Sequence, residues 1–198
     1  MAKLLKFLLI SFLLTTAAFG QFTVIPAGTG SSGGTSIDTI AWDAEDYFFP
    51  DTDPAGFSAD GTEVKWSVIL MAIGEEVQFK KRLTIPIGTS PQCGVSWYLP
   101  SGGPTTNSVR FDCKFACITD GESALSRALG SSNAGTDITV PGTAGLLSDD
   151  TWAASTDFAG CTEGDTMIVE FERLAATGTD ISPATDVYAE HFWISWTN

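Results

Sequence analysis

The sequence predicts an all-β protein, an antiparallel sandwich or barrel of about eight or nine strands with almost no helix. The strongest signal is the alternation of apolar and polar residues in two closing segments, residues 164–173 and 186–196. Bulky apolar residues occupy one face of each segment: Met167, Val169 and Phe171 in the first, and Phe192, Ile194 and Trp196 in the second. We expect these two strands to be neighbours that bury the six side chains between stacked layers. Turn-rich segments separate the periodic runs, and the rest of the chain supplies the opposing sheet.

The earlier strands follow from the same reasoning. Apolar runs predict them at residues 37–42, 64–72, 79–87, 95–99, 109–118 and 137–140. Residues 146–158 carry apolar residues with no clear period, and we interpret them as a further strand. Residues 43–63 combine acidic, aromatic and turn-forming residues, and they predict a long loop held to the body by its aromatics. Residues 122–127 predict a single helical turn, the only helix-like piece of the chain.

The N-terminal residues predict export from the cell. Residues 1–20 combine Lys3 and Lys6 with an apolar run and small residues near position 20, which is the pattern of a cleaved secretory signal. The run is too short to cross a bilayer comfortably, which takes about 20 apolar residues. Residues 21–36 are uncharged and rich in Gly, Ser and Thr, and they predict a flexible arm. Residues 37–198 then form one secreted β-sandwich domain of ordinary size.

The chain is strongly acidic, which argues against two classes of partner. Its 24 Asp and Glu outnumber its 10 Lys and Arg, so the formal net charge is −14. Nucleic acids need a basic surface to neutralise their phosphates, so we expect no nucleic-acid binding. Anionic membranes attract basic segments for the same reason, so we expect no membrane partner after removal of the signal.

The four cysteines, Cys93, Cys113, Cys117 and Cys161, raise the question of disulfides in an exported chain. Cys113 and Cys117 lie on one face of the same predicted strand, about 13 Å apart by strand rise. A disulfide needs Cα atoms within about 7 Å, so these two cannot bridge each other. Each cysteine either pairs with one on another strand or is a buried thiol that packs as a small apolar residue. Zinc is not expected, because no close Cys pair exists and His191 is the only histidine.

Four segments in order carry a family resemblance. They are residues 108–122, residues 140–147 with their Pro-Gly-Thr connection, the Gly-Asp strand at 163–173, and the closing strand at 186–196. Together they resemble the jelly-roll-type β-sandwich domains of tailed-phage structural proteins, especially fibre and appendage proteins. The resemblance covers the chain from about Trp66 to its end. It implies a jelly-roll sandwich with a non-catalytic structural or binding role, on a virion or on a cell surface.

Arg173 lies on the apolar face of its strand, at the strand end. A charge at the margin of a core normally needs a partner, so we expect an ion pair with Asp180 or Asp186 that pins the last loop. The alternative is a guanidinium that reaches water along its aliphatic stem. The role of Arg173 is to stabilise the fold, and it supplies no chemistry.

No residue set predicts an active site, and we expect no enzyme. His191 is accompanied by no second histidine and by no serine in a nucleophile-elbow context. Paired carboxylates such as Asp149 and Asp150 resemble a glycosidase acid and base, but acids are abundant in this chain and none of the pairs lies in a predicted sugar cleft.

We expect no cofactor, with calcium as the one exception. Asp51 and Asp53 open a stretch that has Gly56 at the sixth position of a calcium loop. Ala55 and Thr62 stand where ligands belong, which excludes an EF-hand. A looser oxygen site in this segment is one interpretation, and a solvated acidic loop is the other.

Exposed aromatics mark one candidate surface. The outer face of the closing strand carries Trp193, His191 and Ala189, and Ser96 and Tyr98 share a face of another strand. Such a platform suits sugar stacking or a contact between subunits, because both use Trp and Tyr. The alternative is that a second sheet or the N-terminal arm covers this face.

These features together predict a non-enzymatic structural or adhesive module of an extracellular or virion appendage, with self-association or a surface glycan as its partner. The alternative is a secreted carbohydrate-binding module that uses exposed aromatics, assisted or unassisted by calcium. Self-association predicts a broad apolar patch around Trp193, whereas sugar binding predicts a concave groove with exposed aromatics.

Overall fold

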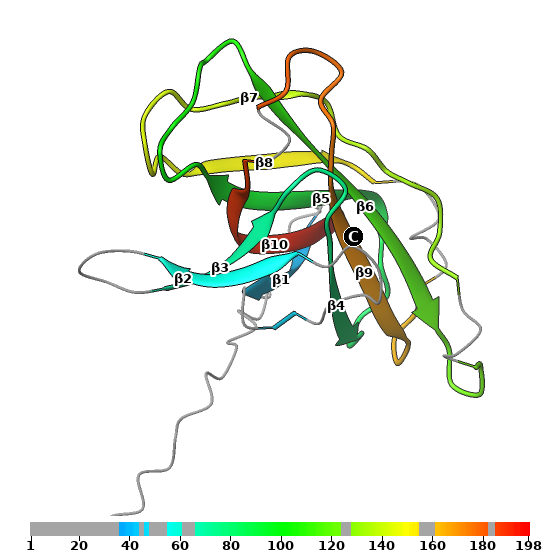
Figure 1. Cartoon of the computed structure of the whole chain (residues 1–198). Helices are drawn as coiled ribbons and strands as arrows, with labels where there is room; N and C mark the ends of the chain where they lie inside the picture. The colour runs from blue at the N-terminus through cyan, green and yellow to red at the C-terminus, as the bar shows by residue number, and fades with distance from the viewer. Residues whose placement is uncertain are drawn as a thin grey trace, which may run out of the picture. The chain divides into compact units, whose positions relative to one another are not determined.

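Two antiparallel β-sheets pack face to face in the computed structural model (Figure 1). The structure describes residues 36–43, 46–47, 55–60, 66–123, 128–154, 161–181 and 185–198, which belong to the compact unit Gly34–Asn198. These residues form ten strands and no helix, so they contain no apolar helix that could cross a membrane. The predicted all-β, jelly-roll-type sandwich is confirmed.

The larger sheet has six strands with β10 at its centre. Its members are β1 (Ile37–Asp43), β2 (Gly56–Asp60), β3 (Trp66–Met71), β5 (Thr89–Tyr98), β8 (Ser148–Ala153) and β10 (Val187–Thr197). One edge of β10 pairs with β5, which in turn pairs with β8. The other edge is divided: β3 pairs with residues 187–189 and β1 with residues 191–197. β10 therefore joins all parts of this sheet.

The smaller sheet has four strands and supplies the opposing layer. In spatial order they are β4 (Glu76–Arg82), β9 (Thr166–Leu174), β6 (Ser108–Ile118) and β7 (Ile138–Thr139). β9 pairs with β6 along its whole length on one edge and with β4 from Thr166 to Glu172 on the other. The Lys and Arg residues of these strands are exposed or partly exposed, with the exception of Arg173, which is buried.

The core fills the space between the two sheets. The six apolar residues that predicted the closing strands are each at most 1% exposed, so their predicted burial is confirmed. The strands that carry them, β9 and β10, belong to different sheets and face each other across the core, so the expectation that they are neighbours in one sheet is wrong. Ring centroids of Phe192 lie 4.9 Å from both Phe79 and Phe171, which joins the two layers through aromatic contacts.

Both disulfides join separate parts of the chain. Cys93 of β5 bonds to Cys113 of β6, with 6.6 Å between Cα atoms, and this bridge links the two sheets. Cys117 bonds to Cys161, with 5.5 Å between Cα atoms, and links the end of β6 to the segment before β9. The prediction that Cys113 and Cys117 do not pair with each other is confirmed, and of the two interpretations the structure supports pairing across strands.

Arg173 is 0% exposed and bridges three segments. Its Nη2 lies 3.0 Å from Asp180 Oδ1, and its Nη1 donates to the carbonyl oxygens of Met71 and Thr185. The other Asp180 oxygen, Oδ2, accepts the amide of Ala176 at 2.6 Å, so one carboxylate closes the last loop onto the guanidinium. The predicted ion pair is therefore made with Asp180, while Asp186 acts on Arg173 only through its charge.

Burial and the carboxylate act in opposite directions on Arg173. Burial lowers the pKa of the guanidinium from its ordinary value, and the charge and hydrogen bond of Asp180 oppose that shift. Because the guanidinium is paired with Asp180 and fully buried, the alternative in which it reaches water is wrong.

Element boundaries differ from the prediction in several places, and β8, for example, covers only Ser148–Ala153 of the expected residues 146–158. β2 lies inside residues 43–63, which were expected to be a loop; pairing with β3 makes this segment a strand. A strand was expected at residues 79–87, but β4 ends at Arg82 because the amide of Leu83 turns to the carbonyl of Asp165 at 2.8 Å. β5 begins at Thr89, before the expected start.

Other predictions lie outside the described residues. These are the signal at residues 1–20, the arm at residues 21–36 apart from its last residue, the aromatics at residues 48–49 and the last four positions of the helical turn at 122–127.

Reduction of both disulfides should strongly destabilise the fold. The bridges close chain segments with separations of 20 and 44 residues. Loop-closure entropy assigns such bridges about 3 and 4 kcal/mol. Urea unfolding with and without dithiothreitol should show a fall of several kcal/mol in the free energy of unfolding, and the loss should reverse on reoxidation. An unchanged midpoint in reductant would contradict this account.

Asp180→Ala should destabilise the domain much more than Asp186→Ala. The first change leaves a buried guanidinium without its carboxylate, which costs about 3–5 kcal/mol. The second removes a charge that makes no hydrogen bond to Arg173 among the described residues, so we expect a loss below about 1 kcal/mol. Denaturant titration of both variants measures the difference. Equal losses would show that Asp180 does not hold the loop in the way that its contacts indicate.

Candidate functional site

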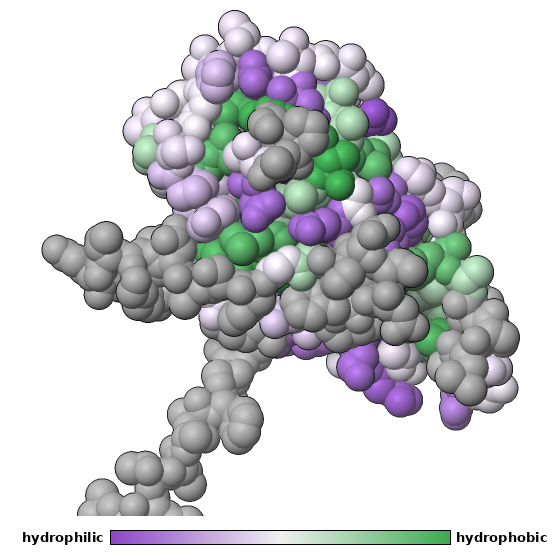
Figure 2. Space-filling view, in the orientation of Figure 1, coloured by the Kyte–Doolittle hydropathy of each residue, from purple (hydrophilic) through white to green (hydrophobic). Residues whose placement is uncertain are grey.

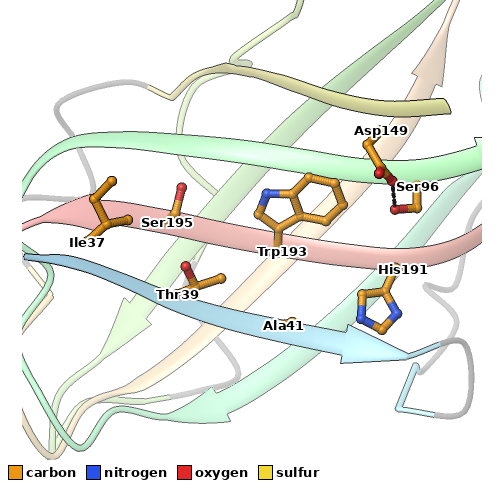
Figure 3. A pocket seen from close by; sticks show the side chains of 8 residues that line it. All are labelled: Ile37, Thr39, Ala41, Ser96, Asp149, His191, Trp193 and Ser195. Atoms are coloured by element: carbon orange, nitrogen blue, oxygen red, sulfur yellow. Dashed lines mark hydrogen bonds between the residues drawn. The ribbon is translucent and has the colours of Figure 1, made fainter. Parts of the chain in front are cut away.

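A shallow hollow of about 430 Å³ lies over the outer face of the six-stranded sheet (Figure 3). Four strands line it: β1, β10, β5 and β8. The lining side chains combine apolar and polar groups: Ile37, Thr39, Ala41, Ser96, Asp149, His191, Trp193 and Ser195. Its volume is within the range of small-ligand sites in proteins, about 300–1,000 Å³.

The alternation of β10 decides which residues reach the hollow. Its inner face carries Phe192, Ile194 and Trp196, so His191, Trp193 and Ser195 point outward. A register shift between Ala189 and His191 inserts one extra residue into β10 relative to β5. Neighbouring strands then place small or polar residues beside each outward side chain.

Trp193 lies in the middle of the hollow between two small residues. Its register partners are Gly94 on β5 and Ala41 on β1. A Cβ atom added to Gly94 would lie 2.1–2.4 Å from atoms Cε2, Cζ2 and Nε1 of the indole. The ring therefore lies across the backbone of Gly94, and Figure 3 shows it reaching from β10 over β5. Because Trp193 is only partly buried, one side of the indole remains accessible.

His191 is held at one end of the hollow by an acidic partner. Its Nδ1 lies 2.7 Å from Oδ1 of Asp43, the register partner on β1. Both side chains are about half exposed, at 48% and 51%. Because Nδ1 is directed at the carboxylate, Nε2 is the ring nitrogen left for another partner.

Asp149 forms the rim of the hollow on β8, at the same end as His191 and in one cross-strand row with His191 and Ser96. The hydroxyl of Ser96, itself 7% exposed, donates to Oδ1 of Asp149. The next residue, Asp150, accepts the indole N–H of Trp97 at 2.7 Å and the hydroxyl of Ser148 at 3.0 Å. These bonds fix β8 against β5, so the Asp149 carboxylate is held at the edge of the hollow.

The polar groups of the hollow do not form a nucleophile and base. The Ser96 hydroxyl is bonded to Asp149, and the His191 ring is bonded to Asp43. Among the residues that line the hollow, no hydrogen bond joins Ser96 to His191, and in Figure 3 the imidazole points toward β1, away from Ser96. The arrangement offers hydrogen bonds and one aromatic face.

The structure brings together two of the three residues predicted for this surface. Trp193 and His191 line the hollow. Tyr98 does not belong to the surface, because it is 3% exposed and its ring packs 5.5 Å from that of Tyr188. Asp51 and Asp53, the predicted calcium ligands, lie outside the described residues. Within the described part of the chain, no group of three or more His, Cys, Asp or Glu side chains is placed to hold a metal ion.

Several residues of this site are not predicted from the sequence, and three of them shape it most. Gly94 supports the indole, Asp43 orients His191, and Asp149 forms the rim. Asp43 was expected at the start of a loop, and Asp149 was considered only as part of a carboxylate pair. Strand register brings them beside β10, and a single sequence does not specify register between strands far apart in the chain.

A second charged group lies on the outer face of the four-stranded sheet. Lys114 Nζ lies 2.8, 3.1 and 3.4 Å from carboxylate oxygens of Glu172, Glu170 and Glu76. Burial lowers the pKa of the Lys114 ammonium, but the hydrogen bonds to Glu172 and Glu170 raise it by more, so the pKa lies above its ordinary value. Burial, followed by the charge of Glu170, raises the pKa of Glu76. The three carboxylates share one ammonium, so the cluster keeps a net negative charge, and the contacts of Lys114 are made within the group.

Comparisons with known proteins show only distant likeness in fold. No protein-family model matches the sequence, and no curated protein matches it either. A family 35 carbohydrate binding module from Clostridium thermocellum has a TM-score of 0.46 and 10% identity, over 79% of this chain and 97% of the module. The xylan-binding module CBM15 has a TM-score of 0.44 and 10% identity, over 82% and 97%.

A viral protein shows a weaker likeness. The enzymatically active domain of tailspike protein 4 from bacteriophage CBA120 has a TM-score of 0.39 and 9% identity, over 79% of this chain and 20% of that one. At these scores and identities, the likeness says nothing about what this chain binds, and it does not single out phage fibre proteins.

Proposed function

We propose that this chain is a secreted, non-enzymatic glycan-binding β-sandwich module whose ligand lies in the hollow over Trp193. The observation that carries the proposal is the indole lying across Gly94 with one face accessible. Pyranose rings present C–H groups on their flat faces, and these pack against the electron-rich face of an aromatic ring. Thr39, Ser96 and Ser195 add hydroxyl groups around the indole, which suit a ligand rich in hydroxyls.

The length of the hollow supports a chain-like ligand. From His191 to Ser195 the strand rises about 13 Å, which is longer than one pyranose ring. The outer face of the sheet continues beyond both residues along β10. An extended oligosaccharide that lies along β10 would therefore contact the indole with a middle unit and the polar rims with its neighbours.

Self-association of a structural module was the first expectation from the sequence, and the site favours the alternative. A subunit interface at Trp193 needs a broad apolar patch. Four large apolar side chains are exposed among the described residues, and only Ile37 lines the hollow, while Ile85, Leu146 and Leu147 do not. On the face drawn in Figure 2, hydrophobic residues form patches that hydrophilic residues interrupt. An adhesive role through a surface glycan remains compatible with this site.

The two disulfides and the predicted signal at residues 1–20 support a location outside the cell, because disulfides persist in oxidising compartments. The calcium prediction for Asp51 and Asp53 stays a prediction, and binding assays run with and without a chelator test it.

Trp193→Ala should abolish most glycan binding without unfolding the domain. Affinity electrophoresis against cellulose derivatives, xylan, chitosan and pectate identifies a ligand, and calorimetry then measures its affinity. Loss of the stacking face should raise the Kd about tenfold or more, which corresponds to a loss of at least about 1.4 kcal/mol in binding free energy. Sedimentation of the unliganded protein should give the mass of one chain. Failure of the wild type to bind any of these glycans, or a dimer that dissociates in Trp193→Ala, would contradict the proposal.

Gly94→Ala should weaken binding of the same glycan although it leaves Trp193 in place. The added methyl group collides with the indole and tilts it off the strand. Gly178→Ala is the matched control, because its Cβ meets only a side-chain oxygen of Asp137 at 3.4 Å. Gly178 lies in the loop after β9 and does not line the hollow. Equal affinities for wild type and Gly94→Ala would show that the flat position of the indole does not matter.

A further inference from the structure

The described basic residues of this domain are confined to one of its two sheets, whereas acidic residues lie on both. Every Lys and Arg that the structure describes lies on β4, β6 or β9 of the four-stranded sheet. The strands of the six-stranded sheet carry Asp and Glu but no Lys or Arg. This distribution places the proposed glycan site on the acidic side of an already acidic protein.

Two carboxylates lie in the cross-strand row next to the indole, at the end of the hollow that holds His191. Asp149 forms the rim on β8, and Asp43 on β1 contacts His191 of β10. Ser96 occupies Oδ1 of Asp149, and among the described residues no hydrogen bond reaches Oδ2. His191 is the one basic side chain that lines the hollow, and its Nδ1 already contacts Asp43.

We infer that the glycan bound over Trp193 is basic, an oligosaccharide of amino sugars with unsubstituted ammonium groups; this inference rests on the proposed function. An ammonium group on a sugar stacked against Trp193 lies within reach of the Asp149 rim and beside an aromatic face, and both attract a cation. Uronic acid or sulfated sugars would meet only repulsion there, because no Lys or Arg of the sheet compensates their charge.

Salt and ligand charge should reveal this preference. The probes are tetramers of β-1,4-linked glucosamine, its N-acetylated form, glucose, and an α-1,4-linked galacturonate, titrated calorimetrically into the disulfide-bonded protein. We expect the glucosamine tetramer to bind about tenfold more tightly than either neutral tetramer, and the galacturonate not to bind. The ratio should shrink in 0.5 M salt, because the Debye length falls well below its value of about 10 Å at 0.1 M.

A matched pair of variants separates a local effect from net charge. Asp149→Asn should remove most of the preference for the glucosamine tetramer, and the readout is the ratio of affinities for charged and neutral probes. Asp120→Asn changes the net charge equally at an exposed turn after β6, and it should leave the ratio unchanged. Equal reductions in both variants would overturn the inference, because general attraction to an acidic protein would then explain the data.

The outcomes also distinguish this inference from the proposed function. If a neutral tetramer binds as tightly as the glucosamine tetramer, or the galacturonate binds, and Trp193→Ala abolishes that binding, the glycan site stands and the inference on charge is wrong. If none of the four probes binds and the wider polysaccharide panel also fails, both are wrong. If glucosamine binding persists in Trp193→Ala, the ligand does not occupy the hollow, and the inference is again overturned.

Discussion

β10 faces the core on one side and the hollow on the other, and an extra residue in the strand keeps its apolar side chains in the core. Val187 and Ala189 point into the core before the register shift, and Phe192, Ile194 and Trp196 point into it afterwards. Strict alternation would turn one of these two sets outward. The bulge at this point keeps both sets inside. It also aligns His191 with Ser96 and Trp193 with Gly94, so the core and the hollow depend on the same local irregularity.

The sequence predicted what short-range periodicity determines. The fold class, the burial of residues such as Phe171 and Trp196, and the impossibility of a bridge between Cys113 and Cys117 all follow from alternation along single strands. The outward direction of Trp193 followed in the same way. The expectation that Ala189 shares the outer face with Trp193 is wrong. The two positions differ by four, so strict alternation puts them on one face, but the bulge between them turns Ala189 into the core. No residue pattern near position 190 predicts this bulge.

What depends on pairing between distant segments was not predictable. β2 has no strand period of its own and exists through β3, and Gly94 matters only because Trp193 lies opposite to it. Arg173 was an intermediate case: its position on a buried face required an acidic partner, but the choice of Asp180 over Asp186 needed the path of the loop. Tyr98 shows the limit clearly, since an outward position on a strand does not ensure that a side chain reaches solvent.

The inter-sheet disulfide also has a consequence for the hollow. Cys93 directly precedes Gly94, so the backbone beneath the indole is covalently tied to β6 in the opposite sheet. A backbone anchored in this way has few conformations to lose when a ligand binds, so the conformational entropy cost of binding is small. The buried Cys93–Cys113 disulfide thus restrains the strand on which the indole of Trp193 lies.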